Sequence, residues 1–278
     1  MIQKSYDKRA SLYLIPTPIG NMEDITLRSL NTLKEVEFIL CEDTRVTSKL
    51  LNYFDIKKPL VRCDEYSQDK VREKVLSTLK NNKNIGLVSD AGSPIISDPG
   101  YVVSKYVIEE GYNVIALPGA TAFVPALSVS DINPAPFIFY GFLNAKSSKE
   151  IKELKSLKDK RETLIFYESP KRLVETLNNM LEVFGDRKIA VCREISKIHE
   201  EVVRGSISEC LKELTTIKGE IVIVVEGNND TVDYSDLDLI EHVNLYVAEG
   251  KSNMDAIKQV AKERNIPKSV VYKEYNKK

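Results

Sequence analysis

The stretch from Ile85 to Gly100 (IGLVSDAGSPIISDPG) sets small and acidic residues directly after an apolar run. The apolar residues 85–88 predict a buried strand, and the Ser, Gly and Pro residues that follow predict a shaped loop. Glycine lets a backbone approach a ligand closely, and an aspartate at the carboxyl end of a strand can bind ribose hydroxyls or a cationic group. The alternative is an ordinary turn between a strand and a helix, which would have the same kinds of residues.

Two other segments have the same pattern. Residues 12–15 lead into Pro16–Asn21, and residues 114–117 lead into Pro118–Ala122. Three short strands with such loops predict an open α/β sheet, in which ligands collect at the carboxyl ends of the strands. Because neither G-x-x-x-x-G-K-[ST] nor G-x-G-x-x-G occurs, a P-loop NTPase and a standard dinucleotide enzyme are disfavoured.

Charged residues follow the next predicted strand, in Cys41–Arg45. Capping of a helix explains Asp43 and Thr44 without any function. Capping does not explain Arg45, because a cation in the first turn of a helix is disfavoured, and this favours a functional role for Arg45.

A similar junction occurs at residues 167–172 (YESPKR). Ser169 would cap a helix that starts at Pro170, and Lys171 and Arg172 could meet phosphates. Further on, His199 lies among acids, where it could act as a base or serve as a surface partner.

The composition limits the classes of protein. A chain of 278 residues can form roughly two domains, and its net charge of −1 means that a polyanion must be met by a local patch. No apolar run approaches the roughly 18 residues of a membrane span, and the first residues lack the apolar core of a signal peptide. Two histidines and four well-separated cysteines make a zinc site improbable. We expect a reduced cytoplasmic protein that holds no metal.

The order of elements predicts two α/β domains. In the first half, strands at 36–41, 85–88 and 113–117 alternate with helices at 44–54, 69–80 and 101–110, which favours one mostly parallel sheet. The second half has strands expected at 137–140, 163–167, 188–193 and 221–226, helices at 147–157 and 170–183, and a possible hairpin at 198–204.

The last fifty residues differ from the rest of the chain in how their charged residues are distributed. A linker is expected at 228–230. Residues 230–249 carry six acids and no Lys or Arg, whereas residues 251–278 carry eight basic residues and three acids. A helix that stops at Gly250, a second one capped near Ser252 and a third after Pro267 resemble a helix-turn-helix module. A helical dimer arm and a solvated tail are the alternatives.

Several motifs, in order from residue 11 to 227, resemble one family. They are LIPTPIGN (14–21), DITLR (24–28), EDTR (42–45), LVSDAGSP (87–94), ISDPG (96–100), LPGA (117–120), FYESP (166–170), FGDR (184–187), RE (193–194) and KGEI (218–221). The chain is similar to the bacterial 16S ribosomal RNA ribose 2′-O-methyltransferases, which belong to the tetrapyrrole methylase superfamily. It departs from them at Cys63–Ser67, where a His-Glu-His-Asn-like run is common, and at Ser93, where Thr is usual.

The resemblance implies an α/β fold with S-adenosylmethionine in a cleft between two domains, here 1–118 and 119–228, followed by a helical tail at 229–278. It also implies a homodimer that acts on 16S ribosomal RNA of the small ribosomal subunit. Carried over by position, the residues expected to bind the cofactor, much of it through the backbone, are Pro18, Ser89, Asp90, Ala91, Gly92, Ser93, Thr121, Ala122, Glu168 and Ile221.

Methylation of a ribose hydroxyl needs alignment of the reacting groups and is helped by a base. Asp43, Arg45 and Asp98 form the expected catalytic set, with Glu42 and Glu194 as further candidate bases. Arg45 would hold a phosphate there. The residues expected to bind RNA are Lys171, Arg172, Arg193, Lys258, Lys262 and Lys268.

Two other functions compete with this one. A methylase of a tetrapyrrole or another small molecule would keep the fold and change the acceptor. A nucleic-acid-binding regulator without enzymatic activity would depend on the tail alone.

Overall fold

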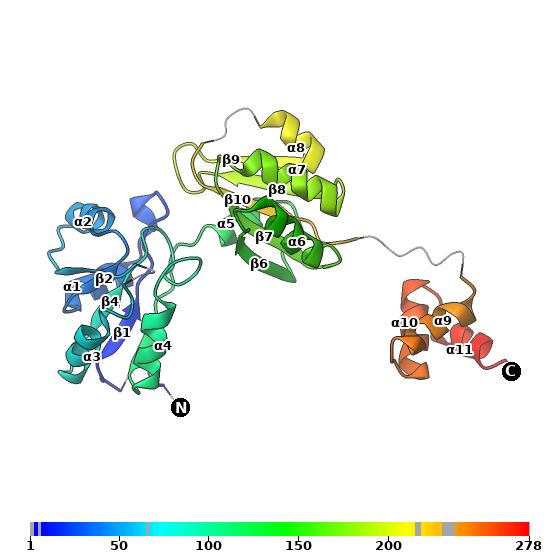
Figure 1. The fold of residues 1–278 in the computed structure, drawn as a ribbon, viewed down its shortest axis with the longest axis horizontal. Coiled ribbons are helices and arrows are strands. Elements are labelled where there is room, and N and C mark those ends of the chain that lie inside the picture. The colour runs from blue at the N-terminus through cyan, green and yellow to red at the C-terminus, as the bar shows by residue number, and fades with distance from the viewer. Residues whose placement is uncertain (1–2, 5–6, 65–66, 215–217, 230–236, 278) are drawn as a thin grey trace. The chain divides into compact units, whose positions relative to one another are not determined.

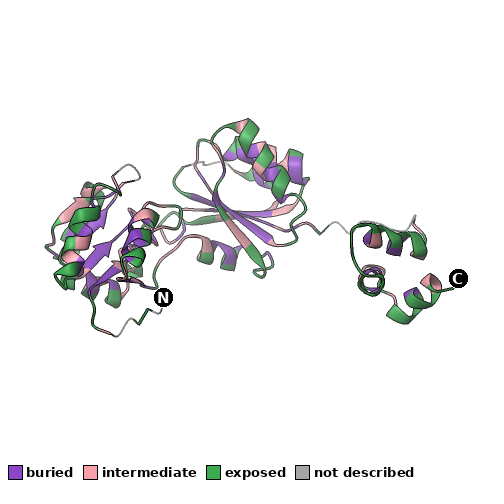
Figure 2. Cartoon of the chain, turned by 60° about the horizontal axis from the view of Figure 1, so that its bottom comes forward, coloured by how far each residue is buried: buried purple, intermediate pink, exposed green. Residues whose placement is uncertain are grey.

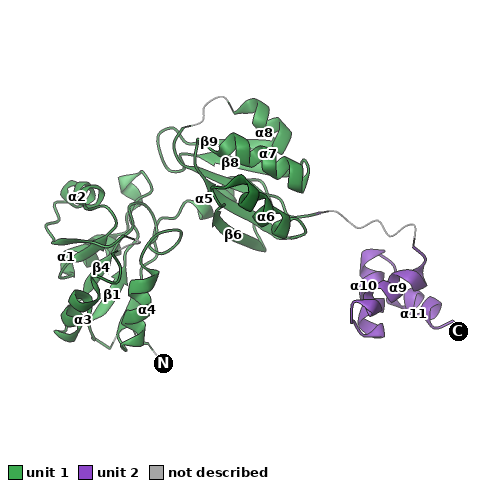
Figure 3. Ribbon diagram, viewed as in Figure 1, with its two compact units in different colours: residues 1–228 green, residues 229–278 purple. Residues whose placement is uncertain are grey.

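The computed structural model describes residues 3–4, 7–64, 67–214, 218–229 and 237–277. The chain forms two compact units, residues 1–228 and residues 229–278 (Figure 3). The predicted boundary between residues 118 and 119 falls inside the first unit, after its first sheet, and stays a prediction.

The first sheet has five parallel strands in the order β3-β2-β4-β1-β5 (Figure 1). The mostly parallel sheet expected from the sequence is therefore confirmed. Its strands are β1 (Ser11–Leu14), β2 (Ile39–Cys41), β3 (Leu60–Arg62), β4 (Ile85–Leu87) and β5 (Asn113–Ala116), and its helices are α1 (Leu27–Glu35), α2 (Thr44–Tyr53), α3 (Arg72–Lys80) and α4 (Tyr101–Glu109), with a 3-10 turn, η1 (Met22–Asp24).

Alternation along β1 shows how both faces of this sheet are covered. Leu12 and Leu14 pack into the cluster that includes α3 and α4, whereas Tyr13 and Ile15 pack into the cluster that includes α1 and α2. Successive side chains point to opposite faces of a strand, and a parallel sheet is normally buried on both. The strands in Figure 2 are accordingly mostly purple between helices with exposed outer faces.

The second sheet is mixed, in the order β6-β7-β10-β8-β9. Only β6 runs parallel to its neighbour, and the other pairs are antiparallel. Helix α5 packs on one face, and α6, α7 and α8 pack on the other. The elements are α5 (Phe123–Val129), β6 (Phe137–Phe142), α6 (Ser147–Leu157), β7 (Thr163–Glu168), α7 (Leu173–Phe184), β8 (Lys188–Arg193), β9 (Glu201–Ser206), α8 (Ile207–Glu213) and β10 (Ile221–Val225).

Three local predictions were wrong. The strand expected from Val36 begins only at Ile39, because the Val36 N–H still bonds to the carbonyl of Thr32 and ends α1. The cap of α2 is Asp43, whose side chain accepts the Arg45 N–H, and Thr44 is the first helical residue. Helix α7 starts at Leu173, after a turn in which the Ser169 carbonyl accepts two N–H groups.

The second unit is a three-helix module. It comprises α9 (Leu239–Ala248), α10 (Asn253–Glu263) and α11 (Lys268–Tyr275), around a core that includes Val243, Ile257 and Val271. The three predicted helices and the cap at Ser252 are confirmed. Of the predicted linker at 228–230, Asp230 lies outside the described residues, as do the residues after it up to 236. No helix in the described parts of the chain is long and apolar enough to cross a membrane.

Candidate functional site

The loops after β1, β4 and β5 meet at one edge of the first sheet. β1 lies between the other two strands and is parallel to both, so the three carboxyl ends lie side by side, as expected. Thr17 and Gly92 exchange backbone hydrogen bonds of 2.9 and 3.1 Å. Ser93 Oγ donates to the carbonyl of Ala120 at 3.1 Å. These bonds join the three loops into one wall.

Two glycines permit this close meeting. A Cβ at Gly119 would lie 2.4 Å from the Cβ of Pro16. Gly92 has a φ of +81°, a left-handed conformation that side chains disfavour, and a Cβ there would lie 3.3 Å from Ile19. The glycines that the sequence places in these loops therefore serve close packing as well as a turn.

A cavity of about 360 Å³, the main cavity, lies between this wall and the second sheet. The second sheet contributes the end of β7 with Ser169 and Pro170, and the start of β10 with Gly219 and Glu220. The volume of the main cavity lies at the lower end of the range for sites of small ligands, roughly 300–1,000 Å³.

The structure brings the ten predicted cofactor residues to two adjoining cavities. Eight line the main cavity, whereas Pro18 and Ser89 line a second cavity of about 320 Å³. The eight are Asp90, Ala91, Gly92, Ser93, Thr121, Ala122, Glu168 and Ile221. Their contact with a cofactor stays a prediction.

Glu168 already has protein partners. Its carboxylate accepts the Ser169 N–H at 2.6 Å and the Thr176 hydroxyl at 2.8 Å, and it lies 3.6 Å from Arg172. Such a buried carboxylate is compensated by hydrogen bonds and a cation. Its place in the wall favours a role in shaping the cavity.

Asp98 is the acid in the main cavity with an unusual pKa. Burial, together with the neighbouring Glu42 and Asp90 carboxylates, raises the pKa of Asp98 to about 7. Burial and like charges both disfavour the ionised form of a carboxyl group. Asp98 can therefore take up and release a proton near neutral pH.

The loop that carries Asp98 is strained. Ile95 and Ser97 have φ angles of +76° and +65°, in a region that a β-branched residue such as isoleucine rarely adopts. The loop packs against β6, where a Cβ at Gly141 would lie 3.0 Å from Ser97 Oγ. Strain of this kind persists only where the surroundings hold it, and it is frequent at functional sites.

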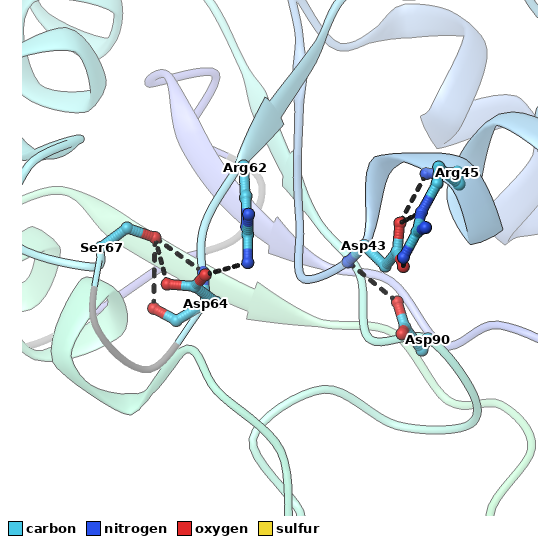
Figure 4. Close-up of polar contacts among 6 residues, drawn as sticks. All are labelled: Asp43, Arg45, Arg62, Asp64, Ser67 and Asp90. Atoms are coloured by element: carbon cyan, nitrogen blue, oxygen red, sulfur yellow. Dashed lines mark hydrogen bonds and ion pairs between the residues drawn. The ribbon is translucent and has the colours of Figure 1, made fainter.

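Asp43 and Arg45 lie beside the cavities rather than in their walls. The Nε and Nη2 atoms of Arg45 donate side-chain hydrogen bonds to Asp43, the shortest of 2.6 Å, and the Asp43 N–H donates to Asp90 at 3.1 Å (Figure 4). The Arg45 hydrogen bonds lower the pKa of Asp43 to about 2. This pairing gives Arg45 a structural explanation that the sequence did not supply.

The segment that departs from the family pattern begins with another ion pair. Arg62 contacts Asp64 at 2.7 Å, and the Ser67 hydroxyl donates to Asp64 at 2.7 Å (Figure 4). Glu65 and Tyr66 lie outside the described residues.

The six residues predicted to bind RNA are in different situations. Arg172 donates to the carbonyls of Leu143 and Asn144, and Arg193 pairs with Glu201 at 2.9 Å, so these contacts favour structural roles. Lys171, Lys258, Lys262 and Lys268 are exposed. None of the six lines either cavity, and RNA binding by them stays a prediction.

Sequence reasoning did not select Tyr167 or Lys197. Burial raises the pKa of Tyr167, which lines the main cavity together with Thr121. Lys197 lines the second cavity and pairs with Glu194 and Glu220, at 2.7 and 2.6 Å. The FYESP motif pointed to Tyr167, but nothing local distinguished Lys197 from an ordinary surface lysine.

Across the described residues, no group of three or more His, Cys, Asp or Glu side chains is placed to hold a metal ion.

A family model and individual relatives match this chain. The model described as Tetrapyrrole (Corrin/Porphyrin) Methylases matches residues 11–211. The Ribosomal RNA small subunit methyltransferase I of Bacillus subtilis is 48% identical over 95% of this chain and 94% of its own. The protein of the same name from Thermotoga maritima is 44% identical, over 78% of this chain and 98% of its own.

Solved structures agree on the fold. A cobalamin biosynthetic enzyme, cobalt precorrin-4 methyltransferase, superposes with a TM-score of 0.58 and 17% identity, over 81% of this chain and 98% of that one.

Proposed function

The chain belongs to the tetrapyrrole methylase family, and from this premise we propose that it methylates a cytidine ribose of 16S ribosomal RNA at the 2′-oxygen with S-adenosylmethionine. The names of relatives at 44–48% identity support a ribosomal RNA acceptor. The choice of the 2′-oxygen as the acceptor atom and of cytidine as the nucleotide rests on the family resemblance of the motifs.

The main cavity fits the methyl donor. Its wall includes Ala91, Gly92 and Ser93, whose small side chains let a ligand with many polar atoms approach the backbone. The carboxylates of Asp90 and Asp98 suit ribose hydroxyls and a positive charge. When bound, the donor would supply an activated methyl group on a positively charged sulfur.

The observation that carries the choice of a hydroxyl acceptor is Asp98 in the wall of this cavity. A ribose hydroxyl is a weak acid that must lose its proton as the oxygen takes the methyl group. A base works best when its pKa lies near the working pH, and that of Asp98 is about 7. We assign the proton to the Asp98 carboxylate, and we assign Asp43 and Arg45 to holding Asp90 and the start of α2.

The test is methyl transfer from labelled S-adenosylmethionine to three acceptors. They are small ribosomal subunits, naked 16S RNA and a uroporphyrin-type tetrapyrrole, followed by mass mapping of methylated ribose. We expect label on cytidine ribose. Label on the tetrapyrrole alone would overturn the proposal, and the absence of any thermal shift with S-adenosylmethionine would favour the non-enzymatic regulator.

We propose that the tail contributes to RNA binding. The Thermotoga relative matches 78% of this chain with nearly its whole length, so the family includes members without about a fifth of this sequence. Deletion of residues 230–278 should weaken RNA binding more than cofactor binding. Equal loss of both would mean that the tail is structural.

A homodimer is the remaining proposal. The edge strand β6 exposes Phe137 and Tyr140, by 43% and 36%, and α5 exposes Val124. Apolar side chains gathered at a sheet edge are typical of an interaction surface. Sedimentation of the protein at micromolar concentration tests this, and a monomer would refute it.

A further inference from the structure

The second cavity adjoins the main one, and outside their common wall it contains only Pro18 and Ser89 of the ten residues predicted to bind the donor. The two cavities share Ile19, Asp90, Ala91 and Glu220. We call these four shared residues the partition. Beyond the partition, the second cavity is enclosed by the loop after β1, by Met22 and by one side of α2. Transfer of a group between two ligands requires two spaces that meet in this way.

The lining of the second cavity suits a flat apolar ring. Pro18 and Met22 lie on the side of the β1 loop, and Val46 and Leu50, one helical turn apart, lie on α2. Methionine adapts to irregular surfaces and favours contact with aromatic rings. At about 320 Å³ the cavity is large enough for one nucleobase and too small for a folded RNA element.

Thr47 supplies a polar group in this lining. Its side chain is 3% exposed, and its hydroxyl makes no hydrogen bond of normal geometry within the described residues. The hydroxyl does lie near enough to the Cys41 thiol to lower that thiol's pKa slightly against the larger, raising effect of burial. Buried polar groups normally have a partner. The hydroxyl is itself buried on the side of Cys41, and rotation about the Cα–Cβ bond would bring it to the cavity, where the polar edge of a ligand would be its partner.

Two lysines lie in the same lining, with different neighbours. Lys197 is neutralised by Glu194 and Glu220. Lys49 has no ion-pair partner among the described residues and is exposed. A lysine without an ion-pair partner, at the rim of a cavity that could hold a nucleobase, is suited to bind a neighbouring phosphate.

From these observations we propose that the second cavity receives the base of the acceptor nucleotide, turned out of the RNA stack. The inference rests on the proposed function. The pyrimidine ring lies between Met22 and Val46, its polar edge meets the Thr47 hydroxyl, and a neighbouring phosphate meets Lys49. The ribose then lies along the partition at Asp90, with its 2′-oxygen toward the main cavity. Enzymes that do chemistry on a base commonly extrude it into such a pocket, and we extend this arrangement to a reaction on the ribose of the extruded nucleotide.

Two variants test the cavity directly. Val46→Trp fills it from a position that is 39% exposed, and Thr47→Val removes the hydroxyl at nearly constant volume. We expect V46W to lower the rate of RNA methylation at least tenfold and T47V to lower it about 5–30-fold, the range for one lost hydrogen bond at a buried site. The affinity for S-adenosylmethionine, measured by calorimetry, should stay within twofold in both.

Ser48→Ala is the matched control. Ser48 lies on α2 next to Thr47 but lines a separate hollow with Asn52 and Lys57. S48A should methylate RNA at the wild-type rate.

A crosslink gives a measurement that needs no variant. A ribosomal RNA fragment with 5-iodocytidine at the methylated position should, under ultraviolet light, attach to peptides that contain Met22 or residues 46–50.

The outcomes separate the two proposals. If the wild-type protein does not methylate ribosomal RNA ribose, the proposed function fails. If it does, but V46W and T47V methylate RNA normally or lose donor affinity in parallel with activity, the assignment of the second cavity is overturned.

Discussion

Asp43, at the start of α2, and Asp98, in the loop after β4, are both candidate catalytic acids in the sequence, but the fold shifts their pKa values in opposite directions. Asp43 caps α2 and holds Arg45 in an ion pair of 2.6 Å, and its pKa falls to about 2. Asp98 is partly buried beside Glu42 and Asp90, and its pKa rises to about 7. Both precede helices, so position along the chain does not separate them.

The difference shows that the partner of an acid determines its chemistry. At neutral pH Asp43 is ionised and, with so low a pKa, is a poor acceptor of a proton. Asp98, with a pKa of about 7, is half ionised and can accept one, because among the described residues no cation pairs with it in the way that Arg45 pairs with Asp43. Among the two acids of the expected catalytic set, this comparison favours Asp98 as the base.

Removal of the Asp98 carboxylate should have the largest effect. Asp98→Asn is expected to lower the rate of RNA methylation about 10²–10⁴-fold, the usual contribution of a general base. Asp43→Asn, which retains a capping side chain, should lower it less than tenfold. Single-turnover rates with saturating donor measure both. A larger loss in D43N than in D98N would reverse the comparison.

The pH dependence should show the same contrast. The rate of the wild-type protein should rise about tenfold per pH unit up to about 7 and then level off, because the ionised form of Asp98 is the base. An essential Asp43, ionised above about 2, would give a rate that does not change between pH 5.5 and 9. Single-turnover rates across that range, with donor affinity checked at each pH, decide between the two.

Stability should respond to the two acids with opposite signs. Because the folded pKa of Asp98 lies above the ordinary value of 3.8, its contribution to stability is lost as the pH rises toward about 7. D98N should therefore melt a few degrees above the wild type at pH 8 and at the same temperature near pH 4. Asp43→Ala, which loses the cap, should melt roughly 2–4 °C lower at pH 8. Calorimetry at the two pH values measures the melting temperatures of both variants. A D98N melting point at pH 8 below that of the wild type would contradict the prediction for Asp98.

The sequence predicted the fold better than it predicted the roles of charged residues. Alternation of apolar strands with loops at Gly92 and Gly119 is a local signal, and it placed three loops at one edge of a parallel sheet. The bonds of Arg45 to Asp43, two residues away, are also local, but they depend on side-chain conformation. Asp90 shares the loop of Asp98, but Glu42 follows β2, and the burial of Asp98 depends on the fold, so its pKa depends on contacts that no local pattern contains.

The start of α7 shows the same limit in the second sheet. A Ser-Pro pair predicted a helix from Pro170, yet the buried Glu168 holds the Ser169 N–H, and the chain makes a turn before Leu173. A hydrogen bond donated by a backbone N–H to a buried carboxylate overrode a local propensity.

Loss of the cation beside Asp43 should have the smallest effect and is the finest test of the comparison. Arg45→Ala leaves the cap in place but removes the side-chain hydrogen bonds that hold the pKa of Asp43 at about 2. A lowered folded pKa stabilises the protein above the unfolded value, and this contribution is lost as the pH falls through the folded value. R45A should therefore unfold at a higher pH than the wild type in acid titrations followed by circular dichroism, while its methylation rate at pH 7.5 changes less than threefold. Arg45→Lys, which keeps a charge but not the paired hydrogen bonds, should lie between the two in acid unfolding. A methylation rate that falls a hundredfold in R45A with donor affinity unchanged would show that this arginine acts on the substrate, and Asp43 would regain its place beside Asp98.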